Sequence, residues 1–149
     1  MLRSYTPSDR EKVAAFHERI LREAGAFAPG PWDDDLKDIE GVYIRPGGCF
    51  VLLEENGALR AMGALKIHSA HIAEIKRMRV ETSLQRQGFG QQILDYLVQF
   101  AKARAIKRLF LDTTHLQTAA QRFYVKNGFI EYERKALKGF TLILYEKCL

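Results

Sequence analysis

Cysteine is scarce in this chain and long apolar runs are missing, and both absences narrow the class of protein. Among 149 residues there are two cysteines, Cys49 and Cys148, which lie far apart and lack the spacing of a metal site or disulfide framework. No stretch approaches the ~20 apolar residues of a membrane span, and the first residues lack the apolar run of a signal peptide. We therefore expect a cytoplasmic protein without a membrane partner, with free thiols and with Cys49 buried in a strand.

The chain also lacks internal repeats, low-complexity segments and linkers, so we expect one domain over residues 1–149. Its hydrophobic fraction of 47% and charged fraction of 28% are typical of a globular protein. The chain is also long enough to form a buried core without disulfides or a metal. The net charge of +5 suits a phosphate-rich cofactor or nucleic acid, but surplus surface lysine and arginine explains it equally well. Nucleic acid is the less favoured partner, because the aromatic residues do not interleave with the basic ones as a stacking platform requires.

Periodicity and turn residues predict an α+β fold. Thr6 is a suitable helix N-cap, Gly25 a helix stop, and Asn56-Gly57 is typical of a tight hairpin turn. The expected elements, in order, are a strand at 2–5, a helix at 7–24, a loop with or without a short helix at 26–41, strands at 49–55, 59–68 and 70–80, a helix at 89–105, a strand at 109–113, a helix at 117–127, and strands at 129–134 and 140–147. The strand–helix–strand step implies one parallel pair, whose ligands lie at the carboxyl ends of the strands.

The apolar pattern of the third long strand changes parity. Ile72, Met78 and Val80 occupy even positions, but Ile75 is odd, and a strict two-residue period cannot bury all four on one face. We therefore predict a β-bulge near Lys76 to Met78, which would leave backbone amides free for a ligand. The alternative is a regular strand with both faces partly covered, which offers no free amides.

The segment Gln85-Arg86-Gln87-Gly88-Phe89-Gly90 joins that strand to an amphipathic helix. Free N–H groups at a helix N-terminus and the helix dipole form an anion site, and glycine lets a phosphate approach the main chain. The segment is neither a P-loop nor a complete dinucleotide motif, since Ile93 stands where a third glycine would be. Alone, it favours an ordinary strand-to-helix turn.

A second segment lies about thirty residues downstream of the glycine turn and reads Ala120-Gln-Arg-Phe-Tyr-Val-Lys-Asn-Gly-Phe129. With both segments in this order, the chain resembles the GNAT superfamily of acetyl-CoA-dependent N-acetyltransferases. The resemblance covers the chain from the first helix to the last strand. It implies a GNAT-like fold, with a mixed, mostly antiparallel sheet of six to seven strands, flanking helices and a central parallel strand pair.

Carried over by position, the resemblance also assigns a cofactor site for acetyl-CoA, with no metal. Met78 and Val80 would offer backbone groups to the pantetheine arm, and Gln117 stands where many members carry a cofactor-contacting asparagine. The pyrophosphate would be wrapped, mostly by main-chain N–H groups, by Arg86, Gln87, Gly88, Phe89, Gly90 and Gln91. The candidates for the nucleotide 3′-phosphate are Lys102, Arg104 and Lys107, for which plain surface solvation is the alternative.

Acetyl transfer to an amine needs a base, an oxyanion donor and a donor for the leaving thiolate. The resemblance places Tyr124 near the cofactor sulfur as acid or hydrogen-bond donor, and Glu74 where several members carry a glutamate that acts through water. The alternatives are a core aromatic for Tyr124 and an exposed strand carboxylate paired with Lys66 or Lys76 for Glu74. The oxyanion donor would be the Met78 amide or its neighbour in the bulge. Among His68, His71 and His115 the reserve base is His115.

The predicted function is therefore transfer of an acetyl group from acetyl-CoA to a primary amine by direct attack in a ternary complex. The acceptor is a small molecule or a peptide amine, and the acidic run at 33–38 either attracts a cationic amine or is simply solvated. Trp32 and Phe27 either line the acceptor pocket or pin the loop. The alternatives are a non-catalytic acyl-CoA sensor of the same fold and, less favoured, a basic nucleic-acid-binding module. Strand edges near the C-terminus are compatible with a homodimer.

Overall fold

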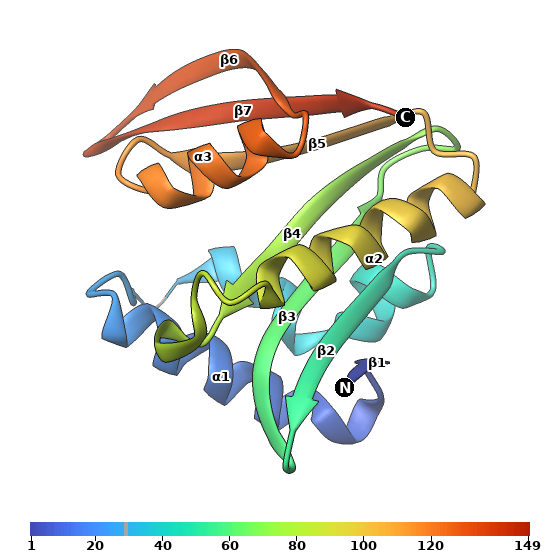
Figure 1. The fold of residues 1–149 in the computed structure, drawn as a ribbon, viewed down its shortest axis with the longest axis vertical. Coiled ribbons are helices and arrows are strands. Elements are labelled where there is room, and N and C mark those ends of the chain that lie inside the picture. Colours follow the sequence, from blue (N-terminus) through green and yellow to red (C-terminus); the bar gives the residue numbers. More distant parts are fainter. Residues whose placement is uncertain (29) are drawn as a thin grey trace.

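Seven strands form a single sheet in the computed structural model, which describes residues 1–28 and 30–149. The strand order is β1-β2-β3-β4-β5-β7-β6 (Figure 1). The strands are β1 (Leu2–Ser4), β2 (Cys49–Glu55), β3 (Ala58–Ile67), β4 (Ile72–Val80), β5 (Arg108–Thr114), β6 (Ile130–Leu137) and β7 (Phe140–Cys148). Neighbouring strands are antiparallel except for β4 and β5, which are parallel. The predicted α+β fold class is confirmed.

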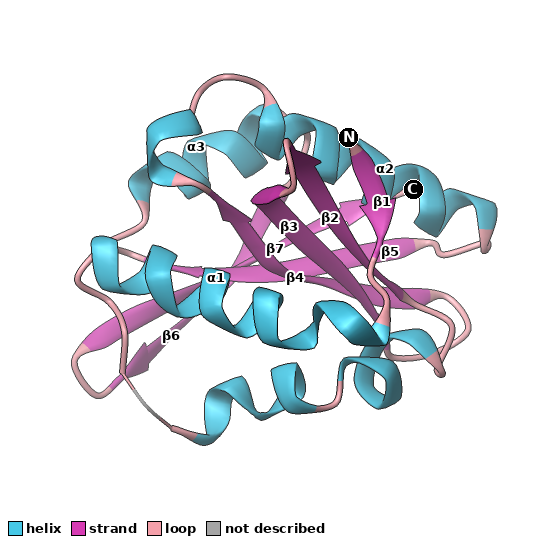
Figure 2. Cartoon of the chain, turned by 90° about the horizontal axis from the view of Figure 1, so that it is seen from below, coloured by secondary structure: helices cyan, strands magenta, loops and turns pink. Residues whose placement is uncertain are grey.

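Helices cover both faces of the sheet. The α-helices are α1 (Arg10–Glu23), α2 (Phe89–Ala103) and α3 (Thr118–Lys126); the short helices are the 3-10 turns η1 (Pro7–Asp9), η2 (Pro31–Lys37) and η4 (Thr82–Leu84) and the π-helical turn η3 (Glu40–Ile44). In Figure 2, α1 lies on one side of the strands, whereas α2 and α3 lie on the other. The predicted loop at 26–41 thus contains the short helix η2, and η3 begins at its end; Pro29 lies outside the described residues.

Two apolar cores form, one on each side of the sheet. The core under α2 contains Val51 and Ala73, whereas the core under α1 contains Phe50 and Leu52. Alternation along β2 explains this division, because successive side chains of a strand point to opposite faces. Cys49 is buried and Cys148 is exposed, and both are free thiols, as predicted.

The predicted bulge in β4 is confirmed. Met62 pairs with Arg79 and Ala64 with Lys76, so Arg77 and Met78 together face Gly63 alone. Arg77 has a positive φ of 60°. Gly63 has no room for a side chain, because a Cβ there would lie 2.4 Å from Ile93 Cγ2 on α2. The close approach of α2 to β3 and the bulge in β4 therefore occur at the same place.

The bulge also reverses the parity of β4. Ala73 and Ile75 belong to the core under α2, and beyond the bulge Met78 and Val80 pack against the same core. The intervening polar side chains are consequently directed away from that core. Because of this change in parity, the side chains of Glu74, Lys76, Arg77 and Arg79 all line one cleft, which is described below.

Several element boundaries differ from those predicted. The third long strand begins at Ile72 rather than at residue 70, and α2 ends at Ala103 rather than at 105. Ala105 has a positive φ of 59°, which no helical residue adopts, and this conformation ends the helix early. β6 runs to Leu137 rather than to 134, because its pairing with β7 continues up to the turn at Gly139.

Candidate active site

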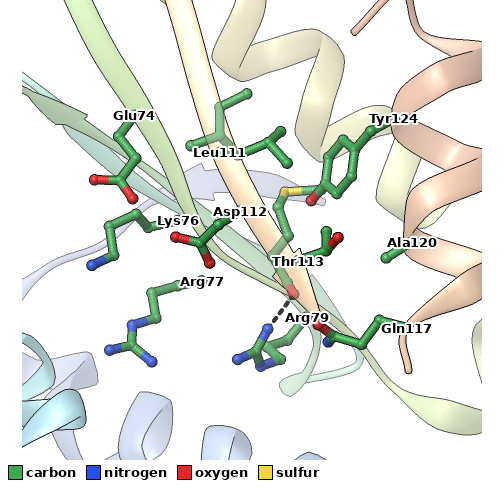
Figure 3. A pocket seen from close by; sticks show the side chains of 12 residues that line it. Glu74, Lys76, Arg77, Arg79, Leu111, Asp112, Thr113, Gln117, Ala120 and Tyr124 are labelled. Carbon is green, nitrogen blue, oxygen red and sulfur yellow. Dashed lines mark hydrogen bonds between the residues drawn. The ribbon is translucent and has the colours of Figure 1, made fainter. Parts of the chain in front are cut away.

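The parallel strands β4 and β5 pair over only three residues and then separate. The last pair is Glu74 with Phe110, beyond which the two strands diverge toward their carboxyl ends (Figure 1). A cleft of about 270 Å³ fills the gap between them (Figure 3). It is lined by Glu74, Ile75, Lys76, Arg77, Met78, Arg79, Leu111, Asp112, Thr113, Gln117, Ala120 and Tyr124. Such a position at the ends of parallel strands is the usual place for a ligand of an α/β unit.

Tyr124 closes one side of this cleft from α3. Its ring packs edge-on against Phe123 and Phe129, with centroid separations of 5.3 Å and 5.7 Å, and the residue is only 6% exposed. Its hydroxyl makes no hydrogen bond within the described residues and points into the cleft in Figure 3. Burial raises the pKa of this hydroxyl well above its ordinary value, so the group stays a proton donor at neutral pH. The ring is a core aromatic, as the alternative held, but the hydroxyl is available to a ligand.

Glu74 lies at the point where the strands part. It is buried, and its Oε1 lies 2.9 Å from His68 Nε2. The imidazole of His68 in turn packs against Phe110, with a centroid separation of 5.0 Å. The alternative of an exposed carboxylate paired with Lys66 or Lys76 is therefore wrong, since Glu74 is held by a histidine inside the cleft wall.

Asp112 is a second carboxylate in the cleft, and sequence reasoning missed it. It follows Phe110 by two residues on β5, so both side chains point to the same face as Glu74. Desolvation by the surrounding strands and then the charge of Glu74 raise the pKa of the Asp112 carboxyl. On the sequence Asp112 is an ordinary polar residue between apolar ones. Only the parallel pairing of β4 with β5 brings the two carboxylates together.

The glycine turn presents unpaired backbone donors at the start of α2. None of the backbone N–H groups of residues 86–91 bonds to another described residue. Gly88 precedes the helix with a φ of +87°, and a Cβ built there would meet nothing within 4 Å. Open space, free donors and a helix N-terminus are the features of an anion site.

A second, basic pocket lies beside this turn. It is lined by Arg86 from the turn and by Ala119, Arg122, Phe123 and Lys126 from α3. Lys102, Arg104 and Lys107 lie instead at the opposite end of α2, where Arg104 stacks on Phe100 at 3.5 Å. The helix has fifteen residues, so this end is ~20 Å from the turn. Arg122 and Lys126 are therefore better placed than those three residues to meet a phosphate near the turn.

The remaining predicted cofactor residues use their side chains elsewhere. Gln91 and Asn127 exchange side-chain hydrogen bonds that tie α2 to α3, and Gln87 donates to the Ser83 carbonyl. The Gln117 oxygen accepts a hydrogen bond of 2.9 Å from the Thr114 N–H, which leaves its amide nitrogen facing the cleft. Phe89 packs against the core under α2. Backbone groups, rather than side chains, thus remain for a ligand at Gln87 and Gln91.

The acidic run is engaged by Arg77. This guanidinium donates to Asp35, to Asp33 at 2.9 Å and to the Trp32 carbonyl at 2.7 Å. Asp35 also accepts a hydrogen bond from the hydroxyl of Tyr43. Burial alone would raise the pKa of Asp35, but the hydrogen bonds from Arg77 and Tyr43 lower it. For Asp33 and Asp35, neither sequence interpretation holds, because they are neither solvated nor free to attract an amine.

The aromatic residues of that loop and two of the histidines lie away from the cleft. Trp32 is 60% exposed and donates to the Ala28 carbonyl, and Phe27 lies under the guanidinium of Arg22. The Nδ1 atoms of His71 and His115 face the Ala105 carbonyl and the Thr141 amide, and neither ring lines the cleft. His115 is therefore a poor candidate for the base.

Residues 1–28 and 30–149 contain neither a metal-ligand cluster nor a membrane-spanning helix. No cluster of three or more histidine, cysteine, aspartate or glutamate side chains has the geometry of a metal site. None of the helices there combines the length and apolar character needed to span a bilayer.

A separated parallel strand pair, a glycine turn with free amides and a tyrosine at the cleft are features that the GNAT resemblance predicts. The model of the Acetyltransferase (GNAT) family matches residues 13–129, and the chain belongs to this family. The resemblance stated from the two motifs is thus confirmed.

Individual relatives support the same family. The N-acetyltransferase YedL of Escherichia coli (strain K12) is 35% identical over 91 residues, which cover 60% of this chain and 57% of that protein. Human N-acetyltransferase 8 is 28% identical over 118 residues, which cover 69% of this chain and 52% of the relative. The chain therefore spans little more than half the length of these curated relatives.

Solved structures confirm the fold. An acetyltransferase of the GNAT family from Staphylococcus aureus Mu50 superposes with a TM-score of 0.89 at 23% identity, covering 99% of this chain and 98% of that one. The ribosomal-protein-S18-alanine N-acetyltransferase of Escherichia coli superposes with a TM-score of 0.77 at 22% identity, covering 99% and 92%. At this level of identity the likeness concerns the fold alone.

Proposed function

We propose that the protein transfers an acetyl group from acetyl-CoA to a primary amine by direct attack in a ternary complex. The observation that carries this proposal is that α3 lines both the basic pocket beside the glycine turn and the cleft. The free amides of residues 86–91 belong to that turn, and the Tyr124 hydroxyl points into the cleft. A long ligand with an anionic end and a reactive end fits this arrangement.

The chain holds this ligand in three ways. The N–H groups of residues 86–91 would bind the pyrophosphate, and Arg86, Arg122 and Lys126 would meet the nucleotide phosphate beside it. The backbone of Met78 and Val80 would bond the pantetheine arm. When bound, acetyl-CoA supplies an acetyl thioester that an amine can attack.

Glu74 takes the proton that the amine must lose. A free alkylamine has a pKa near ~10, so a base must remove a proton before attack. Glu74 lies at the floor of the cleft, and Asp112 on the neighbouring strand offers a second acceptor or a link through water. His68, bonded to Glu74, gives that proton a route to solvent.

Backbone and hydroxyl donors serve the other two needs of the reaction. The Met78 amide in the bulge is the proposed donor to the thioester oxygen, and its position is fixed by the bulge. Tyr124 holds a proton at its hydroxyl oxygen and donates it, or a hydrogen bond, to the departing thiolate as the carbon–sulfur bond breaks and the carbon–nitrogen bond forms.

A cytoplasmic location and a homodimer stay predictions of the sequence.

The test has two stages. The first stage is calorimetric titration with acetyl-CoA, with ATP and NADH as controls, and micromolar binding of acetyl-CoA alone is expected. The second stage is thiol release with a panel of amines. Tight binding without any turnover would contradict the proposal and favour an acyl-CoA sensor.

A matched pair of variants tests the base. Glu74→Gln should lower kcat by about 100-fold, the usual contribution of a positioned base, with little change in acetyl-CoA affinity. Glu133→Gln is the control, because Glu133 lies on the exposed strand β6 and pairs with Lys135. Equal turnover of the two variants would remove Glu74 from the mechanism.

A further inference from the structure

We propose, on the basis of the function proposed above, that the acceptor carries an anionic group near its amine and that Lys76 and Arg79 bind this group. The acceptor would then be an aminocarboxylate or an aminophosphate rather than a simple amine. Three independent features of the cleft support this assignment.

The first feature is that two aspartates of the acidic run are already bound by a cation of the protein. Arg77 donates hydrogen bonds to both Asp33 and Asp35, and its side chain is only 9% exposed. His17 Nε2 lies 3.1 Å from the same Asp33 oxygen that Arg77 contacts, and burial lowers the pKa of this imidazole. Asp33 and Asp35 therefore already bind Arg77 and are not available to an incoming cation.

The second feature is that Arg79 is a cation without a carboxylate partner. Its guanidinium donates one hydrogen bond of 2.9 Å to the Met78 carbonyl (dashed in Figure 3), and its Nε is buried with no partner. Across residues 1–28 and 30–149, no carboxylate forms an ion pair with it. Burial lowers the pKa of Arg79, and the charge of Arg77 lowers it further. A buried unpaired cation is costly, and an anion on the ligand would offset that cost.

The third feature is the free ammonium of Lys76. It lines the same cleft, where its charge acts on the Asp112 carboxyl, but it forms no hydrogen bond or ion pair with any described residue. The bulge places Lys76 and Arg77 consecutively on the cleft side of β4, whereas a regular strand would send one of them to the opposite face. Lys76 and Arg79 thus border the cleft from positions on either side of the fully engaged Arg77.

The carboxylates of the cleft complete the complementarity. Glu74 and Asp112 suit an ammonium group, whereas Lys76 and Arg79 suit an anion, and all four side chains line the same cleft (Figure 3). A volume of about 270 Å³ is below the roughly 300–1,000 Å³ of pockets for drug-sized ligands, so a small acceptor fits best. A guanidinium and an ammonium bind carboxylate and phosphate alike, so both anions belong to the proposed class.

The experiment compares acceptors that differ only in the anion. Acetyl-CoA-dependent thiol release is measured with the twenty amino acids, β-alanine and 4-aminobutyrate, each against its carboxamide, and with O-phosphoethanolamine against ethanolamine. At least one anionic member should be acetylated with kcat/KM about 10- to 100-fold above its neutral partner. The carboxylate and phosphate arms tell the two anions apart.

Variants then assign the effect to residues. For the preferred anionic acceptor, Lys76→Gln and Arg79→Lys should each raise KM by about tenfold or more, with KM for the neutral partner changed less than about threefold. The control Lys12→Gln removes the same charge from α1, where the ammonium pairs with Glu54, and should leave both values unchanged. Circular dichroism and acetyl-CoA affinity verify that each variant folds.

Each contrary result is informative. Preference for neutral amines, or equal losses for both members of a pair in the Arg79 variant, would overturn the anion site and leave acetyl transfer intact. The second of these results would indicate that Arg79 serves the cofactor end of the cleft instead. No transfer to any acceptor, despite acetyl-CoA binding, would contradict the proposed function itself.

Discussion

Arg77 Nε donates a hydrogen bond of 2.9 Å to Asp35 Oδ2, which joins the bulge of β4 to the short helix η2. The two residues lie 42 positions apart in the chain. Because Arg77 is itself the bulged residue with positive φ, its hydrogen bonds fix the bulged strand and the acidic loop in one arrangement. This pair therefore couples the position of the bulge in β4 to the position of the short helix η2.

Loss of the Asp35 charge should loosen that coupling. Asp35→Asn keeps the shape but weakens hydrogen bonds to a charged, mostly buried partner, so the free energy of unfolding should fall by about 1–3 kcal/mol. KM for the acceptor should rise, whereas acetyl-CoA affinity should change little. Urea denaturation and steady-state kinetics measure the two effects.

The neighbouring Asp34 provides the matched control for this variant. Its carboxylate is 60% exposed and pairs with Lys37 at 3.2 Å, so Asp34→Asn should change stability by less than about 0.5 kcal/mol. Equal effects of the two substitutions would show that net charge of the loop, rather than the hydrogen bonds from Arg77, matters.

Removal of the Tyr124 hydroxyl should separate chemistry from binding. Tyr124→Phe keeps the packing against Phe123 and Phe129 but removes the donor in the cleft. We expect kcat to fall by about 10- to 100-fold, with the dissociation constant of acetyl-CoA nearly unchanged. Tyr96→Phe, on α2 beside Phe100, is the control that should keep full turnover. Undiminished kcat in the Tyr124 variant would exclude this hydroxyl from the reaction.

A carboxylate in the glycine turn should abolish cofactor binding. Gly88→Glu places a negative charge at the free amides and strains a residue with φ +87°, so acetyl-CoA affinity should drop by about 100-fold or more. Gly57→Glu introduces the same strain at φ +78° in the β2–β3 turn and should bind acetyl-CoA normally. Calorimetry on both variants checks this, and normal binding by the Gly88 variant would refute the pyrophosphate assignment.

The raised pKa of Asp112 predicts a pH-dependent gain from its removal. A carboxyl whose pKa is higher in the folded than in the unfolded state opposes folding when it is charged. This cost is absent below the unfolded value of 3.8 and complete once the pH exceeds the folded value. Asp112→Asn should therefore raise Tm at pH 7 to 8, and the gain should vanish near pH 3. A gain that is independent of pH would contradict the assigned cause.

The sequence by itself determined the fold class, the bulge and the glycine turn, because each depends on local pattern. The odd position of Ile75 among even apolar residues required an extra residue in β4, and Gly88 and Gly90 before an amphipathic helix predicted a turn with free N–H groups. Tyr124 was found in the same way, through the motif that surrounds it.

Only the tertiary structure decided which charges meet in the cleft. Glu74 and Asp112 lie on strands that are joined through α2, and Arg77 reaches aspartates more than forty residues away, so no local pattern relates them. On the sequence the acidic run was either solvated or an attractor of an amine, yet in the structure Asp33 and Asp35 bind Arg77, and Arg79 has no carboxylate partner among the described residues. Charges pair according to distance in space, and that distance is set by strand order and by the bulge rather than by position along the chain.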